Sequence, residues 1–286
     1  MSKVCIDIGG TNIRVAVIEN NKVLSKEVFT TKPNNPEENM QQIIKVIKSY
    51  NFQVTKIYIC APGPLDEANT MIIYAPNLPG WNNYPFVTIL EQELQIKVYL
   101  INDANAATLG EAIIHKQYQT VIFFTVSTGF GGGLAIKQKI YQGEYNTAFE
   151  IKDYIVEKPN NLISGNLNGL EDFCSGTGIY KLAKLNNMNV RSAKDVFEVA
   201  NTNFTAKLVL DYVAQTIANF MKNISYLFNP GVIVFGGSVM LNNEDFFHKV
   251  VNLYYVEDSL LINKTKVVKA ESQGNSGLIG LANLEV

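Results

Sequence analysis

The residues best suited to chemistry stand where an apolar, β-prone run ends. Val98 to Ile101 form that run, and Asn102 and Asp103 follow it directly, ahead of small residues in a helical pattern. A carboxylate at the carboxyl end of a buried strand is a common position for a working acid in α/β folds. Asp103 is therefore a candidate general base, and the alternative is that it only caps the following helix.

A glycine-rich turn near the N-terminus could bind phosphate. Asp7-Ile8-Gly9-Gly10-Thr11-Asn12 lies between two apolar, β-prone runs within residues 3–18, which predicts strand, tight turn and strand. The backbone N–H groups of such a turn can bind an anion, Thr11 adds a hydroxyl donor, and Asp7 could hold Mg²⁺ through water. A plain hairpin is the alternative, although a hairpin needs neither the acid nor the threonine.

A second glycine-rich turn follows the same plan. Thr120–Val126 predicts a buried strand, Ser127-Thr128-Gly129-Phe130-Gly131-Gly132-Gly133 a turn, and Leu134–Ile136 with Lys139–Tyr141 a hairpin. The two copies lie roughly 120 residues apart, which fits a duplicated domain rather than a short repeat. One such turn per domain could clamp a polyphosphate, so the duplication is the main indication of nucleotide binding.

Helices and strands with recognisable ends would position these turns. Asn35, Pro36 and Glu38 predict the start of a helix over about 36–50, and strand Lys56–Ala61 leads into the rigid turn Ala61-Pro62-Gly63-Pro64. The other expected elements are a strand from Val23 to about Thr31, a helix to about His115, helices at about 173–186, 192–200 and 203–228, a strand over Val232–Phe235, and a helix from Leu278 to about Leu284.

Polar loop residues and a third glycine pair are further candidates. The loop from Tyr74 to Trp81 contains Asn77 and the only tryptophan, and ligand contact or simple packing explains it equally well. Gly236-Gly237 at a strand end suits close approach to a flat ring such as adenine. The acids of the loop-rich region 143–172 could accept hydrogen bonds from sugar hydroxyls or be solvated only. These acids are Glu150, Asp153, Glu171 and Asp172.

The composition is that of an ordinary globular protein. The chain has 286 residues, 47% hydrophobic and 17% charged, and a net charge of −2, which predicts two domains and no nucleic-acid binding. No basic-apolar leader and no apolar run of ~18 residues are present, so we expect neither secretion nor a membrane span. The three scattered cysteines are typical of reduced core thiols in a cytoplasmic protein.

The motifs and their order resemble the ROK family of sugar kinases and sugar-responsive repressors, in the hexokinase/actin-like superfamily. The resemblance covers nearly the whole chain. It is carried by Asp7 to Thr11, Ala61-Pro62-Gly63, Ala75 to Trp81, Asn102 to Ala107, Thr128 to Gly133, and Asn229-Pro230 with Phe235-Gly236-Gly237.

The resemblance implies an α/β fold with two actin-like (ribonuclease-H-like) domains and an interdomain cleft. Residues 1–113 plus about 276–286 would form the small domain and 114–275 the large one. The implied activity is ATP-dependent, Mg²⁺-dependent phosphorylation of a hexose or hexose derivative at the C6 hydroxyl. Glucokinase, N-acetylmannosamine kinase, fructokinase and β-glucoside kinase types all stay open.

The resemblance also implies roles for individual residues. Asp103 would be the catalytic base. The sugar would be bound by Asn77, Asn102, Asp103, Glu150, Asp153 and Glu171. ATP would be bound by Asp7, Gly9, Gly10, Thr11, Asn12, Thr128, Gly129, Gly131, Gly236 and Gly237, with Asp7 also holding Mg²⁺ through water.

Two segments depart from the family pattern. The family's Gly-Glu-Ile-Gly-His reads Phe149-Glu150-Ile151-Lys152-Asp153, so Asp153 replaces the zinc-binding histidine. The family's Cys-x-Cys-Gly-x-x-Gly-Cys-x-Glu loop is matched by 162–171, where all three cysteines are absent and Glu171 remains. Structural zinc needs about four N/S ligands, so we expect no zinc, and packing must hold the loop at 149–171 instead.

Two other functions are alternatives to a kinase. A sugar-responsive repressor would need an N-terminal helix-turn-helix, and the first predicted strand begins at residue 3. A non-catalytic sugar-sensing protein is disfavoured by Asp103 and the two glycine-rich motifs. Relatives in the family are often dimers, so a homodimer is possible.

Overall fold

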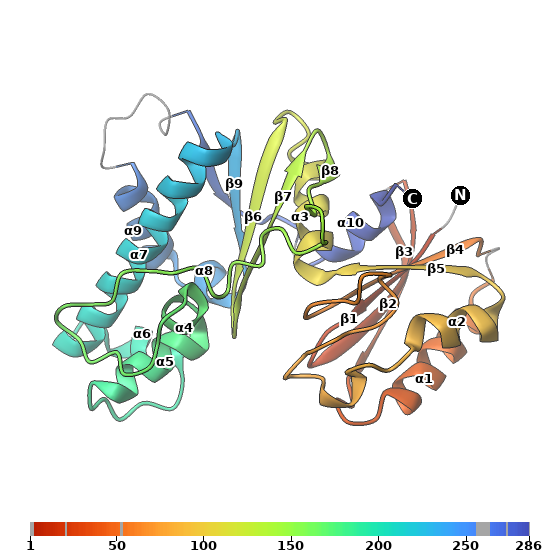
Figure 1. Cartoon of the computed structure of the whole chain (residues 1–286), viewed down its shortest axis with the longest axis horizontal. Helices are drawn as coiled ribbons and strands as arrows, with labels where there is room; N and C mark the ends of the chain where they lie inside the picture. The colour runs from red at the N-terminus through yellow and green to blue at the C-terminus, as the bar shows by residue number, and fades with distance from the viewer. Residues whose placement is uncertain (1–2, 21, 52–53, 256–263, 273, 286) are drawn as a thin grey trace. The chain divides into compact units, whose positions relative to one another are not determined.

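The computed structural model describes residues 3–20, 22–51, 54–255, 264–272 and 274–285 (Figure 1). The chain forms two compact units. One comprises Met1–Ile114, Gln138–Ala148 and Ser272–Val286, and the other His115–Lys137 and Phe149–Glu271. The boundaries expected from the sequence put Gln138–Ala148 in the second domain. The structure groups this segment with the first unit, because the short strand β8 (Lys139–Ile140) packs against helix α3 (Asp103–Ile114).

The first unit is built on a five-stranded mixed sheet. Its strands are β1 (Lys3–Ile8), β2 (Asn12–Glu19), β3 (Lys22–Thr30), β4 (Lys56–Ala61) and β5 (Lys97–Asn102), in the order β3-β2-β1-β4-β5. β1, β4 and β5 run parallel, whereas β2 pairs antiparallel with β1 and β3. The carboxyl ends of the three parallel strands therefore meet at one edge, which carries Asp7, the turn after Ala61, and Asn102-Asp103.

Helices cover both faces of this sheet. α1 (Pro36–Ser49) and α2 (Phe86–Leu94) pack on one face through residues that include Met40, Ile43 and Phe86. α3 and α10 (Ser276–Asn283) cover the other face, where Leu278 and Leu281 meet Cys5 and Tyr58. A short 3₁₀ turn, η1 (Pro79–Trp81), precedes α2. The sequence did not predict α2.

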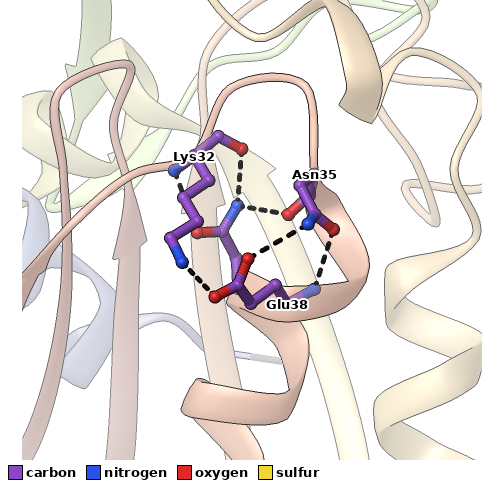
Figure 2. A network of polar contacts seen from close by, with 4 residues as sticks. Lys32, Asn35 and Glu38 are labelled. Carbon is purple, nitrogen blue, oxygen red and sulfur yellow. Dashed lines mark hydrogen bonds and ion pairs between the residues drawn. The ribbon is translucent and has the colours of Figure 1, made fainter.

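The start of α1 confirms the predicted cap (Figure 2). The Asn35 side-chain oxygen accepts a hydrogen bond from the Glu38 N–H at 3.2 Å, and the Asn35 amide donates to the Glu38 carboxylate at 3.1 Å. Lys32 forms an ion pair with Glu38, and the Asn39 amide donates to the Lys32 and Asn35 carbonyls. The bond from Glu38 satisfies an N–H group that a helix start leaves open, and the bonds of Asn39 fix the turn at 31–35.

α3 and α10 cross at unusually short range because each presents a glycine. A Cβ added at Gly280 would lie 1.8 Å from the Ala106 carbonyl oxygen, and one at Gly110 would lie 2.0 Å from the Ser276 carbonyl oxygen. The buried Ser276 hydroxyl donates to the Glu111 carboxylate at 2.6 Å. This contact fixes the axis of α3, whose first residue is Asp103.

The second sheet repeats the topology of the first. Its strands are β6 (Thr120–Val126), β7 (Phe130–Ile136), β8, β9 (Val232–Gly236) and β10 (Lys266–Lys269), in the order β10-β9-β6-β7-β8. β6 pairs antiparallel with β7 and parallel with β9, as β1 does with β2 and β4. The structure thus contains the same strand–turn–strand unit twice.

The second glycine-rich turn is shorter than the sequence predicted. Phe130 to Gly133 belong to β7, where Gly131 pairs with Thr125 and Gly133 with Phe123. A Cβ at Gly132 would lie 2.8 Å from the Phe124 ring, so the glycine makes room for a core side chain. The prediction that the turn extends to Gly133 is wrong, and the turn itself is Ser127 to Gly129.

The helices of the second unit share one hydrophobic core with its sheet, and a phenylalanine cluster lies in that core. They are α4 (Leu170–Cys174), α5 (Gly176–Leu185), α6 (Ala193–Val199), α7 (Phe204–Phe228), α8 (Ser238–Leu241) and α9 (Glu244–Tyr254). Phe124 on β6 contacts Phe220 of α7 and Phe235 of β9, with ring centroids 5.4 and 5.6 Å apart. Among the described helices, none combines the length and apolar character that crossing a membrane requires.

Candidate functional site

The first glycine-rich turn is closed by its own backbone and supported by Thr31. The Gly9 N–H donates to the Asn12 carbonyl at 3.0 Å. Thr31 donates twice, from its hydroxyl to the Gly9 carbonyl at 2.6 Å and from its N–H to the Thr11 carbonyl at 2.9 Å. Thr31 was not among the residues predicted for the site, and it holds the turn in one shape while Thr11 stays exposed.

Asp7 is held by two side chains at the carboxyl end of β1. Arg14 Nη1 lies 2.7 Å from Asp7 Oδ2, and Asp7 and Arg14 are register partners in the β1–β2 hairpin. The buried Cys60 thiol donates to Asp7 Oδ1 at 3.7 Å from β4. Burial, with Asp7 and Asp103 nearby, raises the pKa of the Cys60 thiol, which keeps it a donor. The hairpin register could have predicted Arg14, but not Cys60.

Asn102 rather than Asp103 makes the principal cap of α3. The Asn102 side-chain oxygen accepts hydrogen bonds from the N–H groups of Ala104 and Asn105 at 2.9 and 3.3 Å. Its amide donates to the Gly63 carbonyl at 3.2 Å, which ties α3 to the Pro62-Gly63-Pro64 turn. Asp103 Oδ1 accepts the Ala104 N–H at 2.7 Å, and the residue is half-exposed in the first helical turn. The dipole of α3 favours a negative carboxylate there.

Asn77 lies against the first glycine-rich turn. A Cβ at Gly10 would stand 3.1 Å from the Asn77 Cβ, so the two backbones approach closely. The loop that carries Asn77 is held at its end by the Gly80 N–H, which donates to the Pro33 carbonyl at 3.0 Å. Trp81 is fully buried with its ring edge-on to Phe86, so the tryptophan packs the core, while Asn77 is exposed and available to a ligand.

The second glycine-rich turn is held by the segment at the start of α4 and α5. The Gly176 N–H donates to the Ser127 carbonyl at 2.7 Å, and the Thr177 N–H donates to the Thr128 carbonyl at 3.2 Å. Glu171 Oε2 accepts the Phe130 N–H at 2.8 Å. Thr128 itself is exposed. An expected sugar residue, Glu171, thus contacts the backbone of an expected phosphate loop.

A pocket of about 820 Å³ opens beside this turn within the second unit. Its lining includes Ser127 and Thr128 of the turn, Thr177 and Tyr180 of α5, and Arg191 and Ser192 before α6, together with Ser238, Asn242 and Asn243. The volume and the mixture of an aromatic ring, hydroxyls and a guanidinium suit a small polar ligand such as a nucleoside. Ser127 and Thr128 belong to the predicted turn, whereas Tyr180, Arg191 and the residues that follow them along the chain were not predicted, because they converge only in the fold.

Gly236 and Gly237 are explained by contacts with β6. A Cβ at Gly237, whose φ is +84°, would lie 2.3 Å from the Val126 carbonyl oxygen, and one at Gly236 would lie 2.8 Å from the Phe123 ring. Both glycines are therefore required by the protein's own packing. Ser238, the next residue, lines the pocket.

The segment that replaces the family's zinc loop is held by a backbone ladder and by α7. The Glu171 N–H donates to the Lys152 carbonyl at 3.0 Å and the Leu170 N–H to the Tyr154 carbonyl at 2.9 Å. The Tyr154 ring packs edge-on against Phe220 at 4.8 Å, and the Tyr212 hydroxyl donates to the Glu157 carbonyl at 2.6 Å. Residues 149–157 therefore lie along α7, in agreement with the expectation that packing holds this segment.

Phe149 and Glu150 form the start of that segment. Phe149 has φ +66°, a left-handed conformation that is strained for an aromatic residue, and its ring packs on Phe228 at 5.3 Å. Glu150 is exposed, but the surrounding chain removes part of its solvation. This partial desolvation, with Glu171 and Asp153 nearby, raises the pKa of Glu150, and Lys152 partly opposes the shift. Asp153 is exposed and lies 3.9 Å from Lys152 Nζ.

The donor groups fit a weakly held Mg²⁺. Mg²⁺ is usually bound by one or two carboxylates and substrate phosphates, with waters completing the shell, and Asp7 supplies one oriented carboxylate beside the turn. The described residues include no group of three or more His, Cys, Asp or Glu that could hold a metal ion.

Comparison with known proteins gives a consistent family. The model of the ROK family matches residues 3–285. A glucokinase of Thermotoga maritima is 27% identical and the alignment covers 98% of this chain and 95% of the relative. An N-acetylmannosamine kinase of Escherichia coli is also 27% identical, over 98% and 97%. The crystal structure of a ROK hexokinase from Thermus thermophilus aligns with a TM-score of 0.87 at 25% identity, covering 99% of this chain and 97% of that one.

These matches confirm the expected fold and the expected family, both of which rested on the order of the motifs. The two mixed five-stranded sheets with the same strand order are those of the actin-like, hexokinase fold. Because the family model spans nearly all of the sequence, the chain belongs to the ROK family.

Proposed function

We propose that the protein is an ATP-dependent sugar kinase that phosphorylates a hexose or hexose derivative at its C6 hydroxyl. The observation that carries the proposal is the repeated strand–turn–strand unit, with a carboxylate, Asp103, after a parallel strand of one copy. Phosphoryl transfer depends on positioning and charge neutralisation more than on covalent chemistry, and both turns offer backbone N–H groups for that purpose.

In the first unit, Asp103 would accept the proton of the attacking hydroxyl, and Asn77 would bind the sugar. Asn102 would orient Asp103 by capping α3, and the side-chain amide of Asn102 would lie near the sugar. Gly9, Gly10, Thr11 and Asn12 would bind phosphate, and Asp7, oriented by Arg14, would hold Mg²⁺ through water. Bound Mg²⁺ would neutralise charge on the phosphates.

In the second unit, Glu150 and Glu171 would accept hydrogen bonds from sugar hydroxyls, with Asp153 as a weaker candidate because it is highly exposed. Thr128 and Gly129 would bind phosphate, and the pocket beside them would bind the nucleoside. Gly131, Gly236 and Gly237 would shape this region through packing.

Four further expectations belong to this proposal. The protein would be cytoplasmic, would bind no nucleic acid, would contain no structural zinc and could form a homodimer. Metal analysis of the purified protein tests the zinc expectation, and stoichiometric zinc would refute it.

A coupled ADP-release screen tests the proposed function. The sugars are glucose, N-acetylmannosamine, fructose and a β-glucoside disaccharide, each measured with ATP and Mg²⁺. We expect one or more to stimulate ADP release, with the sugar phosphate formed in equal amount. Sugar binding by calorimetry without ADP release from any of them would instead favour a non-catalytic sugar-sensing protein.

A further inference from the structure

Glu171 contacts two regions of the second unit, one proposed to bind the sugar and one proposed to bind phosphate. Its backbone N–H belongs to the ladder with Lys152, next to the proposed sugar residue Glu150. Its Oε2 accepts the Phe130 N–H at 2.8 Å, at the end of the second glycine-rich turn. Forty-one positions separate these two residues in the chain, and both lie within one unit.

The turn is shaped to receive this carboxylate. A Cβ at Gly129 would lie 2.6 Å from Glu171 Oε2, so any other residue at 129 would displace the side chain. Phe130 is buried with its ring edge-on to Phe124, so the N–H that Glu171 accepts belongs to an anchored residue. Bonds from Gly176 and Thr177 hold the other end of the turn.

We infer, on the basis of the proposed function, that Glu171 is a positioning residue for nucleotide binding. By accepting the Phe130 N–H, it fixes the phosphate-binding turn even when no sugar is present. A hydrogen bond from N–H to an ionised carboxylate is among the stronger ones, and its loss leaves a buried donor unsatisfied. A residue that only bound sugar would leave nucleotide affinity unchanged.

Two physical effects of Glu171 on nucleotide binding have opposite signs. Its negative charge repels phosphate, whereas its hydrogen bond orders the turn. Glu171→Gln separates them, because the amide oxygen can still accept the Phe130 N–H without the charge. Glu171→Ala removes both. If charge dominates, both variants bind ADP more tightly than the wild type, and if positioning dominates, only the alanine variant binds it more weakly.

The test is ADP affinity measured by calorimetry without sugar, together with hydrogen exchange of the Phe130 amide without any ligand. For Glu171→Ala we expect about a tenfold loss of ADP affinity, which corresponds to one lost charge-assisted bond, and faster exchange at Phe130. Glu171→Gln should retain slow exchange and ADP affinity within about threefold of the wild type.

Asp172→Ala is the matched control. Asp172 lies in the same turn of α4, but its carboxylate accepts the N–H groups of Asn168 and Gly169 rather than that of the phosphate turn. It should leave ADP affinity and Phe130 exchange unchanged. An equal loss in this control would assign the effect to the folding of α4 and overturn the inference.

Gly129→Ala provides a second perturbation if Glu171→Ala fails to fold. It displaces the carboxylate while keeping the charge, so it should weaken ADP binding. It should also speed exchange of the Phe130 amide without ligand, which the loss of a phosphate contact at Gly129 alone would not do. Unchanged ADP affinity in both variants would overturn the inference while leaving the proposed function intact. A wild-type protein that binds no ADP would instead contradict the proposed function itself.

Discussion

The crossing of α3 and α10 predicts that a methyl group added at Gly280, one helical turn of α3 away from Asp103, impairs both stability and activity. In Gly280→Ala the new Cβ would lie 1.8 Å from the Ala106 carbonyl oxygen, whereas real Cβ atoms almost never come within 3.0 Å of such an atom. The obstacle is backbone, so the helices must separate by more than ~1 Å. Overpacking costs ~1–3 kcal/mol, and a backbone obstacle this close belongs at the upper end of that range, above the ~1 kcal/mol gained by replacing a helical glycine with alanine.

Gly277→Ala on the same helix is the matched control. Its Cβ would meet only Cys60 Sγ at 3.6 Å, an ordinary contact, so its free energy of unfolding should equal or slightly exceed that of the wild type. Urea unfolding measures both variants. Because α3 begins at Asp103, Gly280→Ala should also lower kcat, by a factor on the order of 10² per ångström of displacement. Equal stability and kcat in the two variants would refute the account of this crossing.

Two more predictions concern charged residues. Because the pKa of Glu150 is raised above its usual 4.5, the acidic limb of the pH profile of kcat/KM for the sugar should lie above pH 4.5. Lys152→Ala removes the cation that opposes this shift, so it should move the acidic limb to higher pH. An acidic limb that does not move in this variant counts against Glu150 as the titrating group. The same raised pKa means that any stability linked to Glu150 is present below its unfolded pKa and is lost as pH rises through the folded one. Arg14→Ala should lower the free energy of unfolding by ~1 kcal/mol, a value discounted because Arg14 and Asp7 are both partly exposed. It should also raise the Mg²⁺ concentration that gives half-maximal activity. A urea midpoint equal to that of the wild type would show that the ion pair with Asp7 adds no stability.

Elements with strong local signals were predictable from the sequence. The Asn35 cap and Pro36 defined the start of α1, and apolar, β-prone runs defined β1, β2 and β6. The duplication was visible because both copies carry glycines after a β-prone run. The tight turn at 9–12 fixes the β1–β2 register, and that register could also have predicted Arg14 opposite Asp7.

Elements without such signals were missed. α2 begins after Pro85, which cannot cap through a side chain, and ends at Gln95 in a left-handed conformation where glycine is usual. The start of β7 was misjudged because glycine is depleted in strands, and only the approach of the Phe124 ring explains Gly132 there.

The candidate site was predictable by residue but not by role. Local patterns identified Asn102 and Asp103 together. That Asn102 is the principal cap and Asp103 the candidate base depends on the Asn102 amide, which points to Gly63, 39 positions away. Glu171 was expected to bind sugar, and its bond to Phe130 could not be foreseen because contacts between distant segments leave no local pattern. The pocket residues around Arg191 were missed for the same reason.

Transfer of phosphate from ATP to a sugar, with and without the Asp103 carboxylate, tests the central claim most directly. The measurement is formation of sugar phosphate by the wild type and by Asp103→Asn at saturating ATP and Mg²⁺, with sugar affinity determined separately. We expect transfer by the wild type, a loss of ~10²–10⁴-fold in the variant, and little change in sugar affinity. Near-full transfer by Asp103→Asn would contradict the assignment of the base, and no transfer by the wild type to any sugar tested would contradict the proposed function.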